Sequence, residues 1–484
     1  MDGVYDFETC YRAIASRDQR FDGRFVVAVT TTGVYCRPSC PSRMPRRENI
    51  RFFRVPAAAE AARFRACRRC RPDAEPCSPE WNVRGDLVGR ALRLIAAGAA
   101  DDGGVAGLAR RLSVSGRHLH RLLVAEVGAG PQALAISRRA RTARLLIESG
   151  PLPLADVAFA AGYASVRQFN DGIRTAYGCA PSQLRRGSAP TRSGGELVLR
   201  LRYRPPLDAG WLLQYLGDRA LPGVEAVDEG TYRRTVRLPH GPGQIAVEFG
   251  DGAMATVRLS LHDLRDVTAA AQRCREVFDL DADPAMIRDE LHGDPSLTPL
   301  IDALPGLRVP GCADGFEMAV RAVLGTHDTG TVAAVVEQYG EAYPGTFGLA
   351  HLFPVPAALA EAPLERTGLA PSRCRTIRAL ARAVGDGRLH LDRGADREET
   401  VAILLGLPGV GPETAAWVAM RALGDPDVLP PSSRAAALRI GLAHPEQHAD
   451  RWRPWRSYAA MHLLATRLSA PHPSAPHPSA PHPT

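Results

Sequence analysis

Four cysteines near the start of the chain have the type and spacing of a metal site. They form two tight pairs, Cys36 with Cys40 and Cys67 with Cys70, about 26 residues apart. Close pairs brought together by a connecting segment supply four soft thiolates at the corners of a tetrahedron, a ligand set that suits one Zn²⁺ ion. The first residues lack the basic and apolar segments of a signal peptide. We therefore expect a reducing compartment, where paired cysteines indicate metal or redox chemistry rather than disulfides.

Arginine crowds both cysteine pairs, and Arg43, Arg46 and Arg47 follow the first pair closely. Arginines around a zinc-thiolate site would attract a polyanion. The site is therefore predicted to react with a polyanionic substrate as well as to stabilise the fold. A plain structural zinc site is the alternative. All 60 basic residues of the chain are arginine. Because there is no lysine, chemistry through a lysine Schiff base is excluded.

The charge of the chain is unevenly distributed. Residues 1–190 contain 30 arginines and 17 acidic residues, a net charge of +13, whereas residues 191–484 contain 30 arginines and 35 acidic residues, a net charge of −5. The first 190 residues are therefore the expected electrostatic footprint on nucleic acid. No run of 18 apolar residues suggests a membrane span, so we expect no membrane partner and a cytoplasmic, nucleoid-associated location.

Residues 81–187 have a helical period and contain two helix-turn-helix patterns. In the first, a helix over 105–112 is followed by a turn and a second helix entered at Ser115; in the second, a helix over 154–160 precedes a helix entered at Ser165. Each serine stands where an N-cap is wanted, and polar side chains face away from the apolar positions. A helical linker bundle is the alternative. The side chains predicted to contact DNA are Arg117, His118, Arg121, Arg167, Gln168 and Asn170.

Two families are recognisable in this half of the chain. Residues 31–40 (TTGVYCRPSC) and 64–73 (FRACRRCRPD) resemble the N-terminal domain of Ada, the bacterial alkylation-response protein. The tandem helix-turn-helix patterns, ended by residues 177–185 (YGCAPSQLR), resemble the AraC-type DNA-binding domain.

The resemblance to Ada implies irreversible transfer of a methyl group from a DNA methylphosphotriester to Cys36. It also implies that Cys40, Cys67 and Cys70 complete a zinc site. Zn²⁺ with four thiolates is formally −2, and methylation of Cys36 leaves −1. Loss of one negative charge beside DNA reduces repulsion by about 1–4 kcal/mol at roughly 4 Å, a gain in affinity of roughly five- to several-hundred-fold. Methylation is therefore predicted to tighten promoter binding. The Pro-Cys-His-Arg motif of Ada's O6-methylguanine methyltransferase domain is absent, so that activity is not predicted.

After a Ser/Gly/Pro-rich linker over 188–196, the pattern changes to strands. Residues 197–203, 232–238, 245–249 and 255–259 alternate apolar and polar side chains, which predicts antiparallel strands with one buried face. A helical period returns from about residue 302 to residue 468. The final Pro/His-rich repeats are predicted to be disordered.

Residues 407–415 (LPGVGPETA) lie between two helical patterns and form a candidate DNA-binding hairpin. Gly409 and Gly411 permit a tight turn, and backbone N–H groups at the start of the next helix can hold a phosphate without sequence preference. With residues 315–325 and 416–427, this hairpin resembles AlkA, the monofunctional 3-methyladenine DNA glycosylase of the helix-hairpin-helix class. The preceding strands resemble that family's N-terminal domain.

The glycosylase resemblance implies a flipped base in an aromatic pocket and an aspartate that stabilises the positively charged sugar. Trp417 matches a pocket aromatic, and Glu413 stands where the family carries another. The catalytic aspartate position holds Ser433, which has no charge, so weakened or absent excision is expected. Asp427, six residues before Ser433, is a candidate to replace the missing catalytic aspartate. The wedge loop also departs from the family, reading Thr326-His327-Asp328-Thr329.

The expected protein is multidomain, α and α+β. We predict a small α/β zinc domain (1–78), an all-α double helix-turn-helix domain (81–187), an α+β antiparallel-sheet domain (196–291), an all-α helix-hairpin-helix domain (302–468) and a disordered tail (469–484). The leading functional hypothesis is a self-consuming methyltransferase and transcriptional activator fused to a base-excision module. It would act on double-stranded alkylated and promoter DNA, as a monomer, with RNA polymerase as a further partner. The alternatives are a pure regulator whose C-terminal module only grips DNA, and a glycosylase that the N-terminal half targets to DNA.

Overall fold

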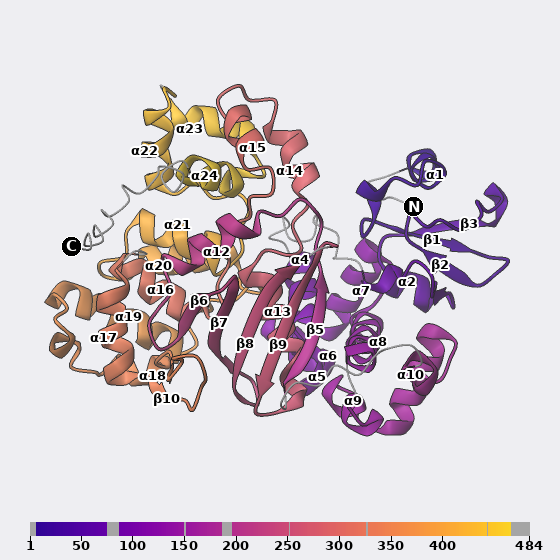
Figure 1. Ribbon diagram of the computed structural model, residues 1–484, viewed down its shortest axis with the longest axis horizontal. Coiled ribbons are helices and arrows are strands. Elements are labelled where there is room, and N and C mark those ends of the chain that lie inside the picture. The colour runs from indigo at the N-terminus through magenta and orange to yellow at the C-terminus, as the bar shows by residue number, and fades with distance from the viewer. Residues whose placement is uncertain are drawn as a thin grey trace, which may run out of the picture.

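The computed structural model describes residues 6–74, 87–149, 152–185, 196–250, 252–325, 328–442 and 444–465 (Figure 1). Residues 188–195 of the predicted linker over 188–196 and the predicted tail over 469–484 lie outside these ranges, as do Thr326 and His327 of the wedge loop. All four expected kinds of domain are present. In the described part of the chain, every helix is too short or too polar to span a bilayer.

The zinc-type domain is built on a four-stranded sheet. In sheet order its strands are β3 (Ile50–Phe53), β1 (Val26–Val29), β2 (Val34–Cys36) and β4 (Arg65–Ala66). The apolar side of α1 (Phe7–Ala15) packs on the sheet through a small aromatic core. α2 (Pro56–Ala61) lies against the sheet and against the next domain. α2 ends at Ala61, and the chain then turns through a positive φ at Arg63 to enter β4.

The next domain consists of helices α4 to α11, with α8 as its long central helix. The bounds are α4 (Leu87–Ala96), α5 (Ala99–Asp102), α6 (Gly104–Arg111), α7 (Gly116–Val127), α8 (Pro131–Ser149), α9 (Leu154–Ala160), α10 (Val166–Tyr177) and α11 (Pro181–Arg185). α6 with α7 and α9 with α10 form the two predicted helix-turn-helix units. Both predicted N-caps are confirmed: Ser115 Oγ accepts from the backbone N–H of His118 and Ser165 Oγ from that of Gln168, each at 3.2 Å.

A five-stranded antiparallel sheet occupies the centre of the molecule (Figure 1). In sheet order its strands are β5 (Leu197–Arg202), β9 (Met254–Leu261), β8 (Gly241–Gly250), β7 (Thr231–Leu238) and β6 (Glu225–Asp228). The four strands predicted from alternation are confirmed, and β6 is an addition. The helices α12 (Ala209–Gly217) and α13 (Val267–Val277) pack on the sheet. The buried side of each strand joins one hydrophobic core that extends from α8 to the last helix.

The C-terminal domain is mostly helical, as expected, with one short β-hairpin added. Its elements are α14 (Pro284–Leu291), α15 (Thr298–Ala303), α16 (Gly315–Leu324), α17 (Thr329–Tyr339), β10 (Glu341–Ala342), β11 (His351–Leu352), α18 (Pro356–Ala360), α19 (Pro371–Gly385), α20 (Arg397–Leu405), α21 (Pro412–Arg421), α22 (Pro431–Arg439), α23 (Pro445–His448) and α24 (Arg456–Ala465). A buried ion-pair network joins this domain to the sheet, because Arg234 of β7 contacts Glu225 at 2.8 Å and Glu317 of α16 at 2.7 Å.

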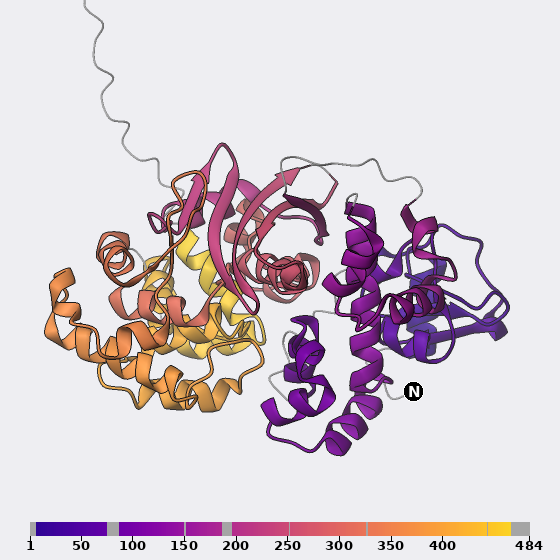
Figure 2. The same cartoon turned by 90° about the horizontal axis from the view of Figure 1, so that it is seen from below.

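The N-terminal and C-terminal halves are in direct contact. α8 runs alongside β5, as both views show (Figures 1 and 2). Around this apolar contact, Arg24 pairs with Asp283 at 2.7 Å, and Arg138 of α8 donates to Thr268 Oγ1 at 3.1 Å. The zinc-type domain, the helix-turn-helix domain and the sheet therefore form a connected structure within the described residues.

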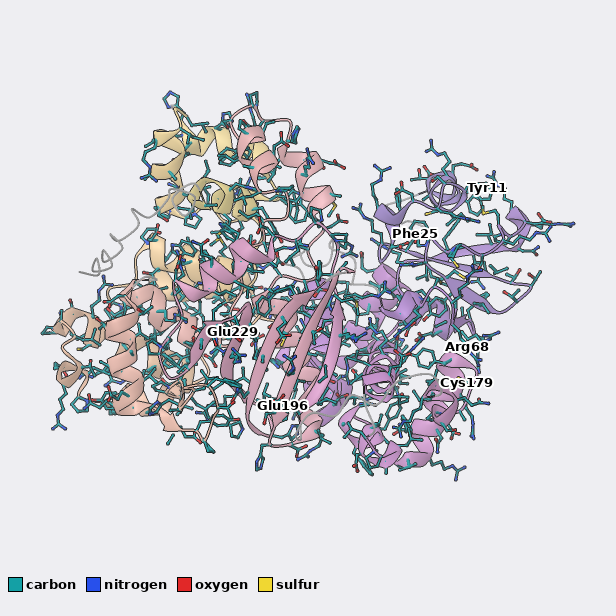
Figure 3. All side chains as sticks on the ribbon, viewed as in Figure 1. Tyr11, Phe25, Arg68, Cys179, Glu196 and Glu229 are labelled. Carbon is teal, nitrogen blue, oxygen red and sulfur yellow. The ribbon has the colours of Figure 1, made fainter. Side chains whose placement is uncertain are left out.

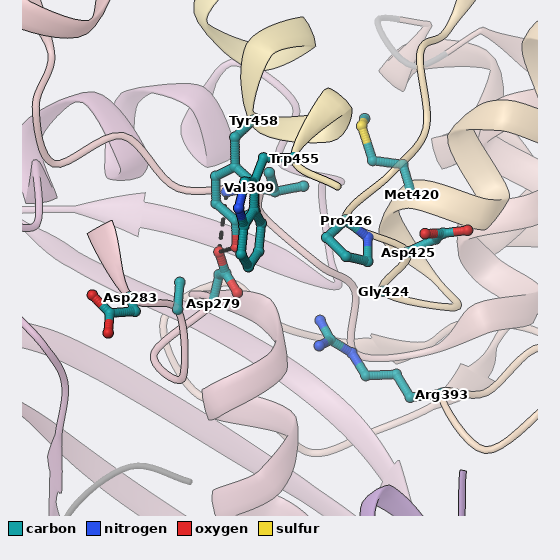
Figure 4. Close-up of a pocket in the computed structure, with 11 residues that line it drawn as sticks. Asp279, Asp283, Val309, Arg393, Met420, Gly424, Asp425, Pro426, Trp455 and Tyr458 are labelled. Carbon is teal, nitrogen blue, oxygen red and sulfur yellow. Dashed lines mark hydrogen bonds between the residues drawn. The ribbon is translucent and has the colours of Figure 1, made fainter. Parts of the chain in front are cut away.

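A polar cavity of about 30 Å³ lies where α24 meets the loop after α13 (Figure 4). Tyr458 donates to Asp279 across this cavity at 2.6 Å, and burial raises the pKa of the Asp279 carboxyl. This volume exceeds the roughly 10–15 Å³ that one ordered water molecule requires, so the cavity has room for water.

His462 of α24 makes stability depend on pH. The side chain is buried, and burial lowers its pKa to about 4 from the usual 6.5. Between these values the unfolded chain binds a proton that the folded chain does not, so stability falls as pH drops from 6.5 to 4, by about 3 kcal/mol at most. We expect His462→Gln to flatten this part of the profile. The check is the denaturation midpoint against pH for both proteins; parallel profiles would contradict the assignment.

Candidate metal centre and nucleic-acid interfaces

The two cysteine pairs meet because β2 and β4 are parallel neighbours. Tyr35 is paired with Ala66, and the backbone N–H of Cys67 donates to the carbonyl of Tyr35 at 2.9 Å. Cys36 and Cys67 therefore emerge side by side at the carboxyl ends of adjacent strands. A tight turn after each strand then returns the second cysteine of each pair, with Cys40 N donating to Arg37 O at 3.1 Å.

The four sulfur atoms form a cluster suited to one zinc ion. The Sγ atoms of Cys36, Cys40, Cys67 and Cys70 all lie within 4.8 Å of one another. In a tetrahedral site with Zn–S bonds of about 2.3 Å, neighbouring sulfurs are about 3.8 Å apart, so only small movements are needed. Hydrogen bonding from Cys40 and the other thiols raises the pKa of Cys36, whereas hydrogen bonding from Cys36 lowers that of Cys67. A cation at the centre lets all four ionise together. The donor set fits zinc, which confirms the predicted cofactor site.

Asp22 holds the turn between Cys36 and Cys40, a role that the sequence did not suggest. Its buried carboxylate accepts the backbone N–H of Ser39 at 3.0 Å and the hydroxyl at 2.5 Å, and Arg37 pairs with it at 3.2 Å. Charge-assisted bonds of this kind fix a loop more firmly than neutral ones. The turn that carries two ligands is therefore rigidly positioned.

The cluster is open to solvent on one side. Cys36 is partly exposed, whereas Cys70 is buried. Arg43 and Arg46 are exposed, and Arg47 is exposed but lies over the rings of Phe7 and Tyr11 at 4.9 and 5.1 Å. Arg47 also pairs with Glu8, whereas the exposed charges of Arg43 and Arg46, close to Cys40 in the sequence, suit a phosphate-bearing substrate.

The loop between Cys67 and Cys70 also touches the second helix-turn-helix unit. Arg68 Nη2 donates to the backbone carbonyls of Gly178 at 3.0 Å and Tyr177 at 3.3 Å, at the C-terminal end of α10. Figure 3 labels Arg68 and Cys179 at this junction. A cation at a helix C-terminus is electrostatically favourable. The metal-ligand loop is thus in physical contact with the helix predicted to read DNA.

A buried ion pair reinforces the same junction. Asp73, just after the last cysteine, accepts from Arg144 of α8 at 3.1 and 3.2 Å and from the hydroxyl of Tyr177 at 3.2 Å. Both charged side chains are almost fully buried. Removal of one partner of a buried pair typically costs about 3–5 kcal/mol. The relative orientation of the zinc-type domain and α10 is therefore strongly constrained.

The six side chains predicted to read DNA lie on α7 and α10. Five of them are exposed and Asn170 is half-buried. Gln168 has a local bond as well, since its Oε1 accepts the backbone N–H of Ala164 at 3.1 Å, and it lines a cleft of about 310 Å³ towards the sheet domain. His118 and Arg121 contact each other, with Arg121 Nη2 and His118 Nδ1 at 3.3 Å. These side chains remain predictions for DNA contact.

The hairpin over 407–415 has the expected backbone. Gly409 has a φ of +80°, and a Cβ there would lie 2.1 Å from Thr376 Oγ1, so glycine is required. Gly411 is the N-cap of α21, and a Cβ there would meet nothing within 4 Å. The start of α21 is therefore open enough for a phosphate to approach the backbone.

Ser433 is fully buried in the first turn of α22. Its hydroxyl donates to the Pro430 carbonyl at 2.5 Å, and its backbone N–H donates to the same oxygen at 2.9 Å. Asp427, the predicted stand-in, lies in ion pairs with Arg453 at 2.6 Å and Arg456 at 2.7 Å. Two arginines neutralise this carboxylate, so its observed role is structural.

Glu413, which stands where the glycosylase family carries a pocket aromatic, makes contacts that the sequence alone did not predict. Its Oε1 accepts the indole N–H of Trp417 at 2.6 Å, and its Oε2 accepts the backbone N–H of Ser432 at 2.9 Å. Glu413 and Trp417 are both half-buried. The predicted pocket aromatic therefore lies against a carboxylate that is bonded to the residue before Ser433.

Comparisons with known families agree with this architecture. A model of the metal binding domain of Ada matches residues 9–73, a helix-turn-helix domain model matches residues 108–187, and a model of the AlkA N-terminal domain matches residues 198–314. These three matches cover the zinc-type domain, most of the double helix-turn-helix domain and the sheet domain.

One relative matches along nearly the whole chain. It is a probable bifunctional transcriptional activator/DNA repair enzyme AlkA of Mycobacterium tuberculosis, 48% identical over 479 residues, which are 95% of this chain and 96% of the relative. The DNA-3-methyladenine glycosylase 2 of Escherichia coli is 33% identical over 279 residues, 55% of this chain and 96% of that protein. The fold of a 3-methyladenine DNA glycosylase from Archaeoglobus fulgidus is similar, with a TM-score of 0.50 at 20% identity over 56% of this chain and 99% of that one. With its cysteine cluster, paired helix-turn-helix units and C-terminal glycosylase fold, this chain belongs to the family of bifunctional transcriptional activator/DNA repair enzymes of the Ada and AlkA type.

Proposed function

We propose that Cys36 accepts a methyl group from a methylphosphotriester in alkylated DNA and that this transfer activates promoter binding. The observation that carries the proposal is the position of Cys36: it is a partly exposed member of a four-sulfur cluster, arginines follow it closely in the sequence, and the loop of Cys67 and Cys70 contacts α10. We assign methyl transfer to residues 1–78, promoter recognition to residues 81–187 and the binding and excision of damaged bases to residues 196–468.

The transfer is a single displacement. Zinc held by Cys36, Cys40, Cys67 and Cys70 would keep the Cys36 sulfur as a thiolate at neutral pH. The thiolate attacks the methyl carbon, the new S–C bond forms as the C–O bond breaks, and the electron pair leaves with the phosphate oxygen. The leaving group is a stable phosphodiester anion, so no general acid is needed. Arginines around the site neutralise the neighbouring phosphates.

Methylation changes the charge of the site in the direction that favours DNA. The Cys36 thiolate becomes a neutral thioether, and one negative charge near the phosphate backbone is lost. Reduced repulsion of about 1–4 kcal/mol at roughly 4 Å corresponds to roughly five- to several-hundred-fold tighter binding. Contacts of Arg68 and Asp73 with the end of α10 and with α8 provide a direct path for orienting the second helix-turn-helix unit.

The C-terminal half is proposed to bind alkylated DNA through the Gly409–Gly411 hairpin and to release damaged bases of the 3-methyladenine type. The glycosylase fold and the E. coli relative support this assignment. We further propose that the protein acts in the cytoplasm, on the nucleoid, as a monomer that recruits RNA polymerase at its promoters.

One incubation tests both activities. Full-length, zinc-loaded protein is mixed with DNA that carries labelled methyl groups. We expect at most one methyl per chain, located at Cys36 by mass spectrometry, together with free methylated base released over several turnovers. Methyl transfer to the protein without base release would show that the chain is a regulator whose C-terminal half binds DNA without catalysis. Base release without protein methylation would contradict the role of Cys36.

A further inference from the structure

We propose that Glu413 is the catalytic carboxylate of the glycosylase module, in place of the acidic residue that is missing at Ser433. This inference rests on the base-excision part of the proposed function and assigns it a residue. It would account for base excision by a chain with serine at that position.

Base excision creates a positive charge that needs a nearby anion. The bond between C1′ and the base nitrogen breaks, and its electron pair leaves with the base. A base alkylated at a ring nitrogen carries a positive charge, so it departs neutral and the charge moves to the sugar. Water then adds to C1′ and releases a proton. A carboxylate beside the sugar stabilises the oxocarbenium-like transition state.

Neither of the carboxylate positions expected from the sequence provides this charge. Ser433 is neutral, and its hydroxyl is already bonded to the Pro430 carbonyl. Asp427 is bound by Arg453 and Arg456. The carboxylate bonded to the first turn of α22 is that of Glu413, through the backbone N–H of Ser432 at 2.9 Å.

Glu413 lies beside an aromatic ring and close to the hairpin turn. Trp417, one turn further along α21, donates its indole N–H to the carboxylate at 2.6 Å, so an aromatic ring and an anion lie side by side. Two N–H donors orient the carboxylate, and the start of α22 complements its charge. Glu413 is also two residues from Gly411, so the carboxylate is close to the open turn proposed to hold a phosphate.

A second observation at this place concerns Ser432. Its hydroxyl oxygen is buried and has no hydrogen-bond partner among the described residues. Buried hydroxyl groups normally have a partner, so this hydroxyl is available to a water molecule or a substrate oxygen. A water molecule or a substrate oxygen positioned by Ser432 would lie next to Glu413.

The test is Glu413→Gln in the full-length, zinc-loaded protein. The amide keeps the size of the side chain and an acceptor for Ser432 or Trp417, but it removes the charge. We expect single-turnover release of 3-methyladenine from methylated duplex DNA to fall by about 10²–10³-fold. Affinity for the DNA and methylation of Cys36 should stay within about twofold of wild type. Glu361→Gln, an exposed glutamate of the same domain, is the matched control and should excise normally.

Each outcome decides between the hypotheses. If wild type excises and Glu413→Gln excises equally fast, Glu413 is not the catalytic carboxylate. If wild type releases no base but Ser433→Asp does, the wild-type chain lacks the carboxylate, and both this inference and the base-excision proposal fail. Should the glutamine variant unfold, Glu413→Asp decides instead, since it keeps the charge. Excision by that variant well above the background of uncatalysed release supports the inference, and excision at background contradicts it.

Discussion

Replacement of Cys36 by serine should abolish methyl uptake from methylphosphotriester DNA. A serine hydroxyl is a far weaker nucleophile than a thiolate, because its pKa lies several units above that of a thiol. Three sulfur ligands and one oxygen remain, so the fold of residues 6–74 should persist. The check is mass spectrometry of the protein after incubation with methylated DNA. The amount of methylated protein should fall below the detection limit.

The same variant tests the switch. Unmethylated wild type should bind promoter DNA weakly, and methylated wild type should bind roughly five- to several-hundred-fold more tightly. Cys36→Ser should bind as tightly as methylated wild type, because three thiolates and a neutral serine hydroxyl give the zinc centre the same formal charge of −1. Cys10→Ala is the matched control, because Cys10 is buried in the same domain outside the sulfur cluster. It should take up one methyl group as wild type does. Equal promoter affinity in all three states would contradict a charge-based switch.

Removal of zinc by a strong chelator should unfold the N-terminal domain. This domain is small, and structural zinc sites contribute about 10–16 kcal/mol of apparent free energy in zinc-finger peptides. Hydrogen exchange should therefore show loss of protection in β2 and β4, whose carboxyl ends carry Cys36 and Cys67. Promoter affinity should fall as well, because Arg68 and Asp73 would no longer hold α10 and α8.

The C-terminal half provides the internal control for this experiment. Its sheet and its helical domain hold no part of the sulfur cluster, so hydrogen exchange in β7 and α16 should be unchanged, and base release should persist. Restoration of zinc should recover protection in β2 and β4. Retention of full protection in these strands after complete zinc removal would show that the domain folds without its metal.

Local sequence rules were sufficient for much of this protein. The serine N-caps of α7 and α10 and the four alternating strands depend on patterns within a few residues. The cysteine spacing likewise predicted the metal site, because two close pairs of cysteines supply the four thiolates that a structural zinc site uses. The added strand β6 has only four residues, and only Val227 and Ala226 in it are apolar, which explains why alternation did not predict it.

Other features depend on residues that are distant in the sequence. The parallel pairing of β2 with β4 brings the two cysteine pairs together across 31 positions between Cys36 and Cys67. Asp22 reaches Ser39, and Arg68 reaches Gly178, 110 positions away. No local pattern encodes such contacts, because they arise when preformed elements pack against one another.

The glycosylase site shows most clearly which features the sequence predicts and which depend on the tertiary structure. From the sequence alone, Ser433 was already known to lack the charge that excision needs, and Asp427 was the candidate replacement. The packing of α21 against α22 decided otherwise, since it brings Glu413 to the backbone of Ser432 while Arg453 and Arg456 bind Asp427. Residue types and short spacings determined which chemistry this protein can perform. The tertiary structure decided which side chains meet to perform it, because a hydrogen bond or an ion pair depends on distance in space and not on distance along the chain.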